Sequence, residues 1–116
     1  MEHVRRPAEA FQSISRVLKP GGYHVFTVPI YSEETTVRID TTTDEDVHLL
    51  PPLYHGDPLR SQGALAYYDF GMDILNMANA FGFESAVTIH NREDRRWMSG
   101  HVIVSRKTVK AADSVA

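Results

Sequence analysis

The chain has 116 residues, of which 42% are hydrophobic and 23% charged, a length and composition typical of one globular domain with a modest core. The formal net charge of −3, with both signs interspersed, argues against a nucleic-acid-binding face, and the absence of cysteine excludes disulfides, thiolate metal sites and cysteine nucleophiles. No apolar run approaches the roughly 20 residues that span a bilayer, and the charged first residues lack the apolar core of a signal peptide, so we expect a cytoplasmic protein without a membrane partner.

The first predicted element is a helix over Pro7–Leu18. Proline suits the first helical position, where its missing N–H has no partner. Helical spacing unites five apolar residues into one stripe: Ala10, Phe11, Ile14, Val17 and Leu18. Pro20 and the glycine pair Gly21–Gly22 then end the helix and reverse the chain.

A strand is predicted next, over Tyr23–Pro29. Val25 and Thr27 alternate with Phe26 and Val28, so neither face of the strand is strongly polar. Such strands are typical of the interior of parallel sheets that helices cover on both sides. An interior strand needs neighbours at both edges, and we therefore expect this chain to hold only part of its sheet.

Residues 30–68 form a long excursion without strong periodicity. The segments "TTVRID" and "DVHLL" predict a hairpin in which Val37 and Ile39 face Val47 and Leu49. The prolines and glycine of "PPLYHGDP" argue against regular structure there. Loops of this length are usually functional or disordered, and the aromatic residues argue against disorder.

The remaining elements are a helix and two strands. "DFGMDILNMANAFGF" predicts a helix capped by Asp69, with its end at Gly82 and an apolar face of Ile74, Leu75, Ala78 and Phe81. "SAVTIH" and "HVIVSR" predict two strands, antiparallel because the loop between them is too short for a crossover helix. Residues 1–107 would then form one partial domain and residues 108–116 a flexible tail.

Residues 1–29 resemble part of a known enzyme family. "MEHVRRPAEAFQSISRVLKPGGYHVFTVP" resembles the stretch around the fourth and fifth strands of class I S-adenosylmethionine-dependent methyltransferases, where an acid–His–Val sequence leads into a helix that ends in an "LKPGG" turn. "HLLPPLYHGDP" and "LAYYDFGMD" look similar to a bacterial subgroup of these enzymes. The resemblance covers residues 1–107. It implies an α/β fold, the C-terminal half of a Rossmann-like domain, with an excursion of hairpin and loop. Its mixed sheet would end in an antiparallel pair whose last strand inserts between the two strands before it.

The chain departs from the family at the cofactor site. The family binds S-adenosylmethionine with a glycine-rich loop after the first strand and an acid at the end of the second, by the physics of dinucleotide binding. The glycine pair Gly21–Gly22 follows a helix and reads as a turn. We therefore assign no residue to the cofactor and expect the first strands of the sheet to lie outside this chain, as in a truncated gene product or an excised fragment.

The resemblance places Glu2 and His3 beside the transferred methyl group, with His3 as base or substrate hydrogen-bond partner and Glu2 as a substrate-binding residue. The alternative is that both belong to a disordered terminus. The loop "YHGDP" supplies three more candidates: His55 as a catalytic residue, with Tyr54 and Asp57 as substrate-binding residues. Here the alternative is a turn in which Asp57 caps its own backbone and Tyr54 is a packing anchor.

Other polar groups carry weaker signals. The set His48, His55, Asp57 and Asp69 lacks the spacing of helical metal motifs, and we expect no metal site. His24 and His101 alternate with β-branched residues and are interpreted as structural. The loop residues Arg92, Arg95, Arg96 and Trp97 are interrupted by two acids, which favours a solvated hairpin tip over a phosphate site.

Two hypotheses for function follow. In the first, the chain is the acceptor-side portion of a methyltransferase that acts on a small hydroxylated molecule, such as a sugar-containing one. The isolated chain would then be inactive without the cofactor-binding half. In the second, it is an inactive fragment that binds itself or a partner through the edge of strand Tyr23–Pro29. A homodimer would bury that edge and a face of helix Pro7–Leu18, whereas a separate N-terminal half would be the other possible partner.

Overall fold

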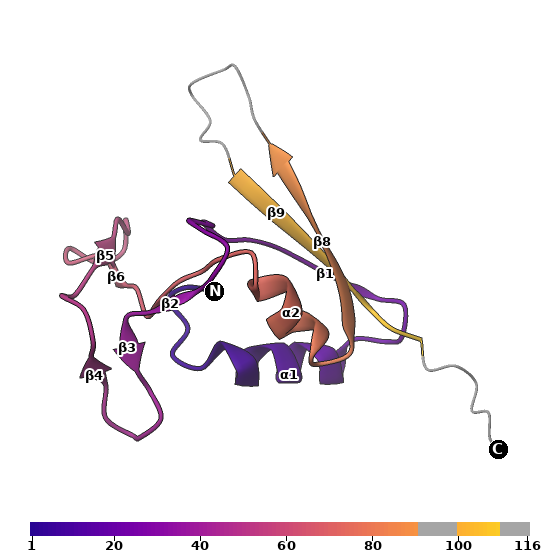
Figure 1. Cartoon of the computed structure of the whole chain (residues 1–116), viewed down its shortest axis with the longest axis horizontal. Helices are drawn as coiled ribbons and strands as arrows, with labels where there is room; N and C mark the ends of the chain where they lie inside the picture. Colours follow the sequence, from indigo (N-terminus) through magenta and orange to yellow (C-terminus); the bar gives the residue numbers. More distant parts are fainter. Residues whose placement is uncertain (91–99, 110–116) are drawn as a thin grey trace.

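The described part of the chain folds as a small mixed α/β domain with two helices, one three-stranded sheet and several short strand pairs (Figure 1). A computed structural model describes residues 1–90 and 100–109. The main elements are α1 (Pro7–Val17), β1 (Tyr23–Thr27), α2 (Ile74–Asn79), β8 (Phe83–His90) and β9 (Gly100–Lys107). Between β1 and α2 lie six two-residue strands: β2 (Thr36–Val37), β3 (Ile39–Asp40), β4 (Val47–His48), β5 (Tyr54–His55), β6 (Ala64–Leu65) and β7 (Tyr68–Asp69). Among the described residues, no helix is long and apolar enough to cross a bilayer.

The three-stranded sheet has the order β1–β9–β8, with β9 antiparallel to both neighbours. Val104 of β9 lies opposite Val25 of β1 on one side and opposite Ala86 of β8 on the other. The predicted antiparallel pairing of the last two strands is confirmed. The last strand, β9, also lies between β1 and β8, as the resemblance implies.

Strand β1 differs from its prediction. It pairs antiparallel with β9, and in the part of the chain that the structure describes no strand pairs with its other edge. His24 and Phe26 point toward the helices, whereas Tyr23 and Val25 are each 58% exposed. Within the described residues β1 is therefore covered on one face only, because both helices lie on one side of this sheet (Figure 1), and its open edge agrees with the expectation that the chain holds only part of its sheet.

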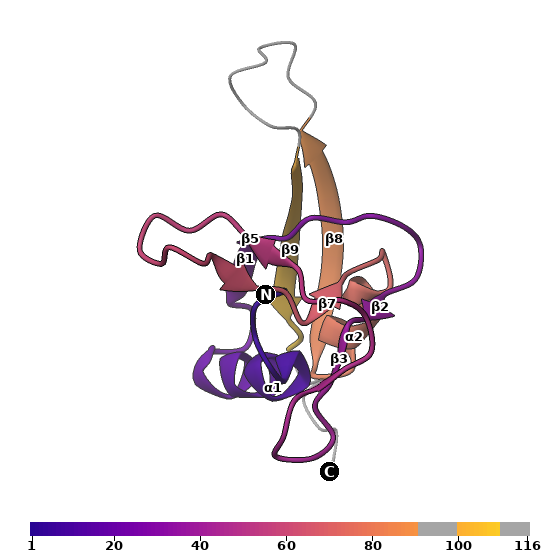
Figure 2. The same cartoon turned by 90° about the vertical axis from the view of Figure 1, so that its left-hand side faces the viewer.

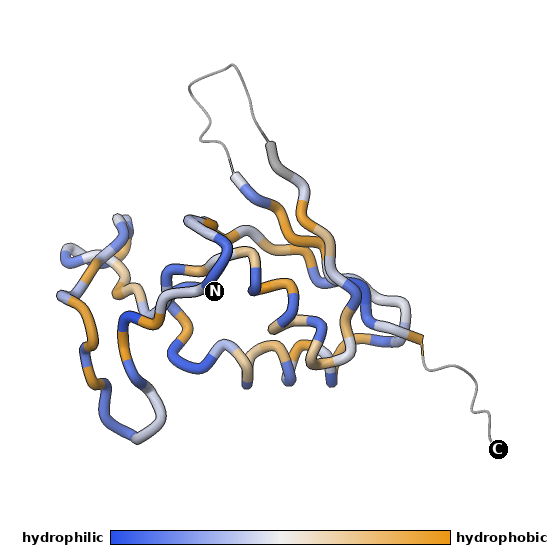
Figure 3. The backbone as a smooth tube through the Cα atoms, in the orientation of Figure 1, coloured by the Kyte–Doolittle hydropathy of each residue, from blue (hydrophilic) through white to orange (hydrophobic). Residues whose placement is uncertain are grey.

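The core lies between the helices and the covered face of the sheet. Its fully buried members are Phe11 of α1, Ile74 and Ala78 of α2, Ile103 of β9, and Val28 and Phe70. Figure 3 shows that the loop joining β3 and β4 is hydrophilic, whereas hydrophobic segments concentrate along the sheet strands. The predicted stripe of α1 is correct for Phe11, but Val17 at its end is 75% exposed because no described element reaches it.

The turns after α1 and α2 contain the glycines that the sequence predicts at these helix ends. Gly21 and Gly82 have φ of 83° and 86°, the left-handed conformation that favours glycine after a helix. The Lys107 ammonium donates hydrogen bonds to the carbonyl oxygens of Ser15 and Leu18, which places a positive charge at the negative end of α1. The interpretation of Gly21–Gly22 as a turn is thereby confirmed.

The excursion contains more pairing than predicted, in a different register. β3 pairs with β4, with Ile39 opposite His48, whereas Val37 of β2 lies opposite Tyr68 of β7. The expected facing of Val37 and Ile39 with Val47 and Leu49 is therefore wrong. The segment "PPLYHGDP" was expected to be irregular, yet Tyr54–His55 forms β5 and pairs with β6. Proline is tolerated beside such an edge strand because the prolines flank the paired residues.

The second helix is shorter than predicted. Its first residue is Ile74, and the residue before it, Asp73, binds the N–H and hydroxyl of Thr35 rather than capping the helix. Asp69, the predicted cap, belongs to β7 and accepts a 2.8 Å hydrogen bond from Arg38. The predicted cap is therefore wrong.

Candidate functional site

Three ionisable side chains from two distant parts of the chain, residues 2–3 and residue 55, meet at one place. Oε1 of Glu2 lies 3.4 Å from Nε2 of His3 and 3.9 Å from Nδ1 of His55. The two imidazole rings lie edge to face, with centroids 4.8 Å apart. Glu2, His3 and His55, three of the five site residues predicted from the sequence, thus form one cluster. Glu2 and His3 have defined partners instead of forming a disordered terminus.

Backbone pairing brings the cluster together. The N–H of Tyr67 donates to the carbonyl of Glu2 at 2.8 Å, which fastens the first residues to the segment after β6. His55 lies opposite Ala64 in the β5–β6 pair. The turn between these strands requires Gly63, since its φ is 85° and a Cβ there would lie 2.3 Å from the carbonyl oxygen of His55.

The surroundings of His3 determine its tautomer. Its Nδ1 lies 2.9 Å from the carbonyl oxygen of Leu65. A carbonyl oxygen only accepts hydrogen bonds, so Nδ1 carries the proton and donates. In the neutral ring Nε2 is then unprotonated, with its lone pair on the side of Glu2 and His55.

Glu2 is held as a carboxylate. Burial would raise its pKa, but the hydrogen bond from its own backbone N–H and the nearby terminal ammonium outweigh burial and hold the pKa below its ordinary value. The amine of Met1 binds Oε2 at 3.1 Å, which leaves Oε1 to the two imidazoles. The cluster therefore combines one negative charge with two imidazoles.

The cluster borders a cavity of about 880 Å³ at the carboxyl end of β1. Figure 2 shows β5 and the N-terminus in front of the sheet strands, on the side that faces the viewer. The lining residues come from the first residues, the end of β1, β5 and the start of β9: Glu2, Thr27, Val28, Pro29, Ile30, Tyr31, His55, Gly56, Gly100 and His101. The volume is in the range of small-molecule sites.

Of the predicted site residues, Glu2 and His55 line this cavity, whereas His3, Tyr54 and Asp57 do not. The Asp57 carboxylate accepts a 2.9 Å hydrogen bond from the N–H of Leu59, the local capping turn weighed as the alternative. Tyr54 is 41% exposed in β5, so it is not a buried packing anchor. The backbone of this loop thus places His55 and Gly56, but not Tyr54 and Asp57, against the cavity.

The remaining histidines have separate surroundings. His24 stacks on Phe26 with ring centroids 4.5 Å apart, which fits the structural role expected for it. His101 lines the cavity, a position that its alternation with β-branched residues did not indicate. His48 is exposed on β4. The loop residues Arg92, Arg95, Arg96 and Trp97 lie outside the described residues.

Two ion-pair groups, neither of them predicted from the sequence, hold the excursion together and fasten it to the first residues of the chain. Arg38 bonds Asp69 and also donates to the carbonyl of Pro51 at 2.8 Å. Arg5 bonds Asp46 at 2.6 Å, and the Tyr67 hydroxyl donates to the other oxygen of the same carboxylate at 2.8 Å. These hydrogen bonds, that of Arg5 first, hold the pKa of Asp46 below its ordinary value. No local sequence signal links such distant partners.

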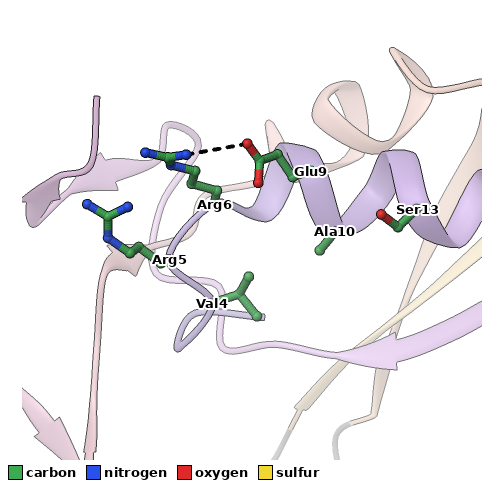
Figure 4. Close-up of a pocket in the computed structure, with 6 residues that line it drawn as sticks. All are labelled: Val4, Arg5, Arg6, Glu9, Ala10 and Ser13. Atoms are coloured by element: carbon green, nitrogen blue, oxygen red, sulfur yellow. Dashed lines mark ion pairs between the residues drawn. The ribbon is translucent and has the colours of Figure 1, made fainter. Parts of the chain in front are cut away.

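A second cavity, of about 430 Å³, lies beside the start of α1 (Figure 4). Its residues are Val4, Arg5, Arg6, Glu9, Ala10 and Ser13. Figure 4 shows the ion pair of Arg6 with Glu9, at 3.6 Å, across its rim. Because its acid is exposed and paired with an arginine, this cavity lacks a group poised for proton transfer.

The glycine pair Gly21–Gly22 does not form a cofactor-binding loop. Gly21 donates its N–H to the carbonyl of Lys107, and an added Cβ there would face Arg106 and Val109. The glycine pair thus closes the turn at the amino end of β1, opposite the cavity.

Comparison with known protein families, with curated proteins and with solved structures finds no match for this chain.

Proposed function

We propose that this chain is the acceptor-side portion of a cytoplasmic S-adenosylmethionine-dependent methyltransferase that acts on a small hydroxylated acceptor, such as a sugar-containing molecule. The observation that carries the proposal is the cluster of Glu2, His3 and His55, of which Glu2 and His55 line a cavity beside the carboxyl end of β1. Ligands of open α/β sheets bind at the carboxyl ends of strands. The family resemblance supplies the reaction class, and the strand order β1–β9–β8 is the order that it implies.

The residues of the cluster suit proton removal from an acceptor hydroxyl. The cofactor, when bound, supplies a methyl group on a sulfonium. The unprotonated Nε2 of His3 would accept the hydroxyl proton of the acceptor, whose oxygen would take the methyl group while the sulfonium sulfur leaves as a neutral thioether. The Glu2 carboxylate, 3.4 Å away, stabilises the resulting imidazolium, and His55 holds the acceptor from the opposite side of the cluster.

The test is methyl transfer by this chain mixed with a separate polypeptide that carries the glycine-rich first half of a class I methyltransferase. Release of S-adenosylhomocysteine is measured over a panel of small glycosides and other hydroxylated acceptors. Turnover is expected only when both polypeptides are present. Replacement His3→Ala should lower kcat by about 100-fold or more, the usual contribution of a general base.

His48→Ala is the matched control, since this histidine is exposed on β4 away from the cavity, and its kcat should stay within about twofold of the unaltered chain. Calorimetric titration of the chain alone with S-adenosylmethionine should give no saturable heat. Failure of every acceptor in an associated pair, or normal turnover by His3→Ala, would refute the proposal.

A second candidate function is a binding module, and the exposed side of the sheet favours it. The open edge of β1 and the exposed side chains of Tyr23 and Val25 form an apolar surface on a single strand. Unpaired strand edges recruit other strands. We propose a second copy of this chain as the occupant, because antiparallel pairing of two β1 strands about Val25 places Tyr23 of each opposite Thr27 of the other and joins the two sheets.

A further inference from the structure

We propose that Glu2, His3 and His55 form a binding site for a divalent transition-metal ion, with Zn²⁺ as the preferred ion. One candidate ligand atom from each residue lies within 4.8 Å of the other two. Two ligands of a tetrahedral zinc ion are about 3.4 Å apart, given metal–ligand distances of about 2.0–2.1 Å. The Glu2–His3 distance has this value already, and small rotations of the His55 side chain close the rest.

The orientation of His3 is that of a metal ligand. Histidines that bind metals almost always donate their other ring N–H to a carbonyl or carboxylate, which fixes the tautomer. The hydrogen bond from Nδ1 of His3 to the Leu65 carbonyl does this and directs Nε2 toward the other two residues. Without a cation or a proton between them, a lone pair of His3 and a carboxylate oxygen face each other at 3.4 Å, which is unfavourable.

The ligand set indicates the class of metal. Two imidazoles and one carboxylate suit zinc and neighbouring first-row ions, whereas Mg²⁺ prefers oxygen ligands and keeps its waters. Three protein ligands leave at least one coordination position open, as in catalytic zinc sites. That position faces the cavity, since both Glu2 and His55 line it.

Metal binding does not rest on the proposed function, but it would change how the acceptor is activated. A metal-bound hydroxyl loses its proton more readily than a free one. The metal ion and the free imidazole of His3 are therefore alternative means of producing the nucleophile, because Nε2 cannot hold both a metal and the acceptor proton. Sequence spacing predicted no metal site, because His3 and His55 are far apart along the chain.

The test is isothermal titration calorimetry of the full chain, without a histidine tag, with Zn²⁺ and separately with Mg²⁺. We expect one saturable Zn²⁺ site per chain, no comparable Mg²⁺ site, and visible absorption bands of a tetrahedral centre with Co²⁺. Changes in residues that only orient a ligand weaken metal binding by about 10- to 100-fold. Loss of a ligand in His3→Ala or His55→Ala should therefore weaken Zn²⁺ binding by at least about 100-fold.

His48→Ala should bind Zn²⁺ as the unaltered chain does, and circular dichroism shows whether each variant remains folded. Proton NMR of the unaltered chain gives a measurement that no substitution can confound: Zn²⁺ should shift the ring signals of His3 and His55 and leave those of His24 and His48 in place. Absence of a one-to-one site, or equal loss of affinity in His48→Ala, would overturn the proposal. Zinc binding without methyl transfer would leave this site standing and remove only the proposed enzyme activity.

Discussion

At the scale of single residues, His24 shows how surroundings decide the chemistry of a side chain. Its ring lies between aromatic neighbours, stacked on Phe26 and edge-on to Phe11, and its Nδ1 atom is buried without a hydrogen-bond partner among the described residues. Burial, with a smaller contribution from the terminal ammonium, lowers the pKa of His24. The folded chain therefore keeps this imidazole neutral where the unfolded chain protonates it.

This difference predicts a loss of stability in weak acid. The folded pKa of His24 is below the unfolded value of about 6.5, so the unfolded chain binds more protons as the pH falls through that value and stability decreases. In His24→Phe this contribution is absent. Urea denaturation at pH 7.5 and 5.5 should show the unaltered chain losing more unfolding free energy than the variant over that interval.

Direct NMR titration of the His24 ring provides an independent check. Its midpoint should lie below the ordinary histidine value. A midpoint at or above about 6.5, or parallel stability curves for the two proteins, would contradict the assignment.

At the scale of elements, the excursion is joined to α2 through close backbone contact at Gly71. This buried glycine forms an isolated bridge with Ser32, and its N–H donates to the hydroxyl of Thr35. A Cβ at this position would lie 2.5 Å from the carbonyl carbon of Glu34 and 2.6 Å from its nitrogen. These are backbone atoms, so no side-chain rotation relieves the contact.

Gly71→Ala should therefore lower the free energy of unfolding by about 2 kcal/mol, as overpacking commonly does. Gly56→Ala is the matched control, because a Cβ there meets no atom within 4 Å, and its effect should stay within about 0.5 kcal/mol. Denaturant unfolding of both variants measures the difference. Equal stability of the two would show that the segment before β2 moves away without cost.

At the scale of the whole molecule, the sheet is covered on one face only. Both helices pack on the face of Phe26 and Ile103, while the opposite face presents Tyr23 and Val25 to solvent (Figure 1). Contiguous exposed apolar residues next to an open strand edge mark interaction sites. This arrangement is the basis for the second candidate function.

The chain is accordingly expected to form a homodimer through β1. In sedimentation equilibrium, the unaltered protein should have twice the chain mass of 13.1 kDa, and Val25→Lys should shift it to one chain mass by placing a charge at the centre of the interface. Leu59→Lys is the control, since Leu59 is 91% exposed and far from β1 in the sequence and should leave the dimer intact. A monomer over a wide concentration range would exclude self-association through this edge.

Local chemistry in the sequence by itself determined α1, the glycine turns after both helices and the antiparallel strands β8 and β9. Helical spacing around Phe11, left-handed glycines and alternating β-branched residues act over a few neighbouring positions, so the sequence reveals them. The same local chemistry suggested Glu2, His3 and His55 as separate candidates, through a resemblance and through a stiff loop.

Only the tertiary structure decided which of these candidates meet. The register of β3 with β4 and the pairing of β5 with β6 join separate segments of the excursion, and the hydrogen bond from His3 to Leu65 joins residues 62 positions apart. Such pairings depend on the sum of many weak contacts and leave no signal in neighbouring residues. The tertiary structure also decided that one face of β1 is exposed, because the sequence of an apolar strand does not show whether one or both of its faces are covered.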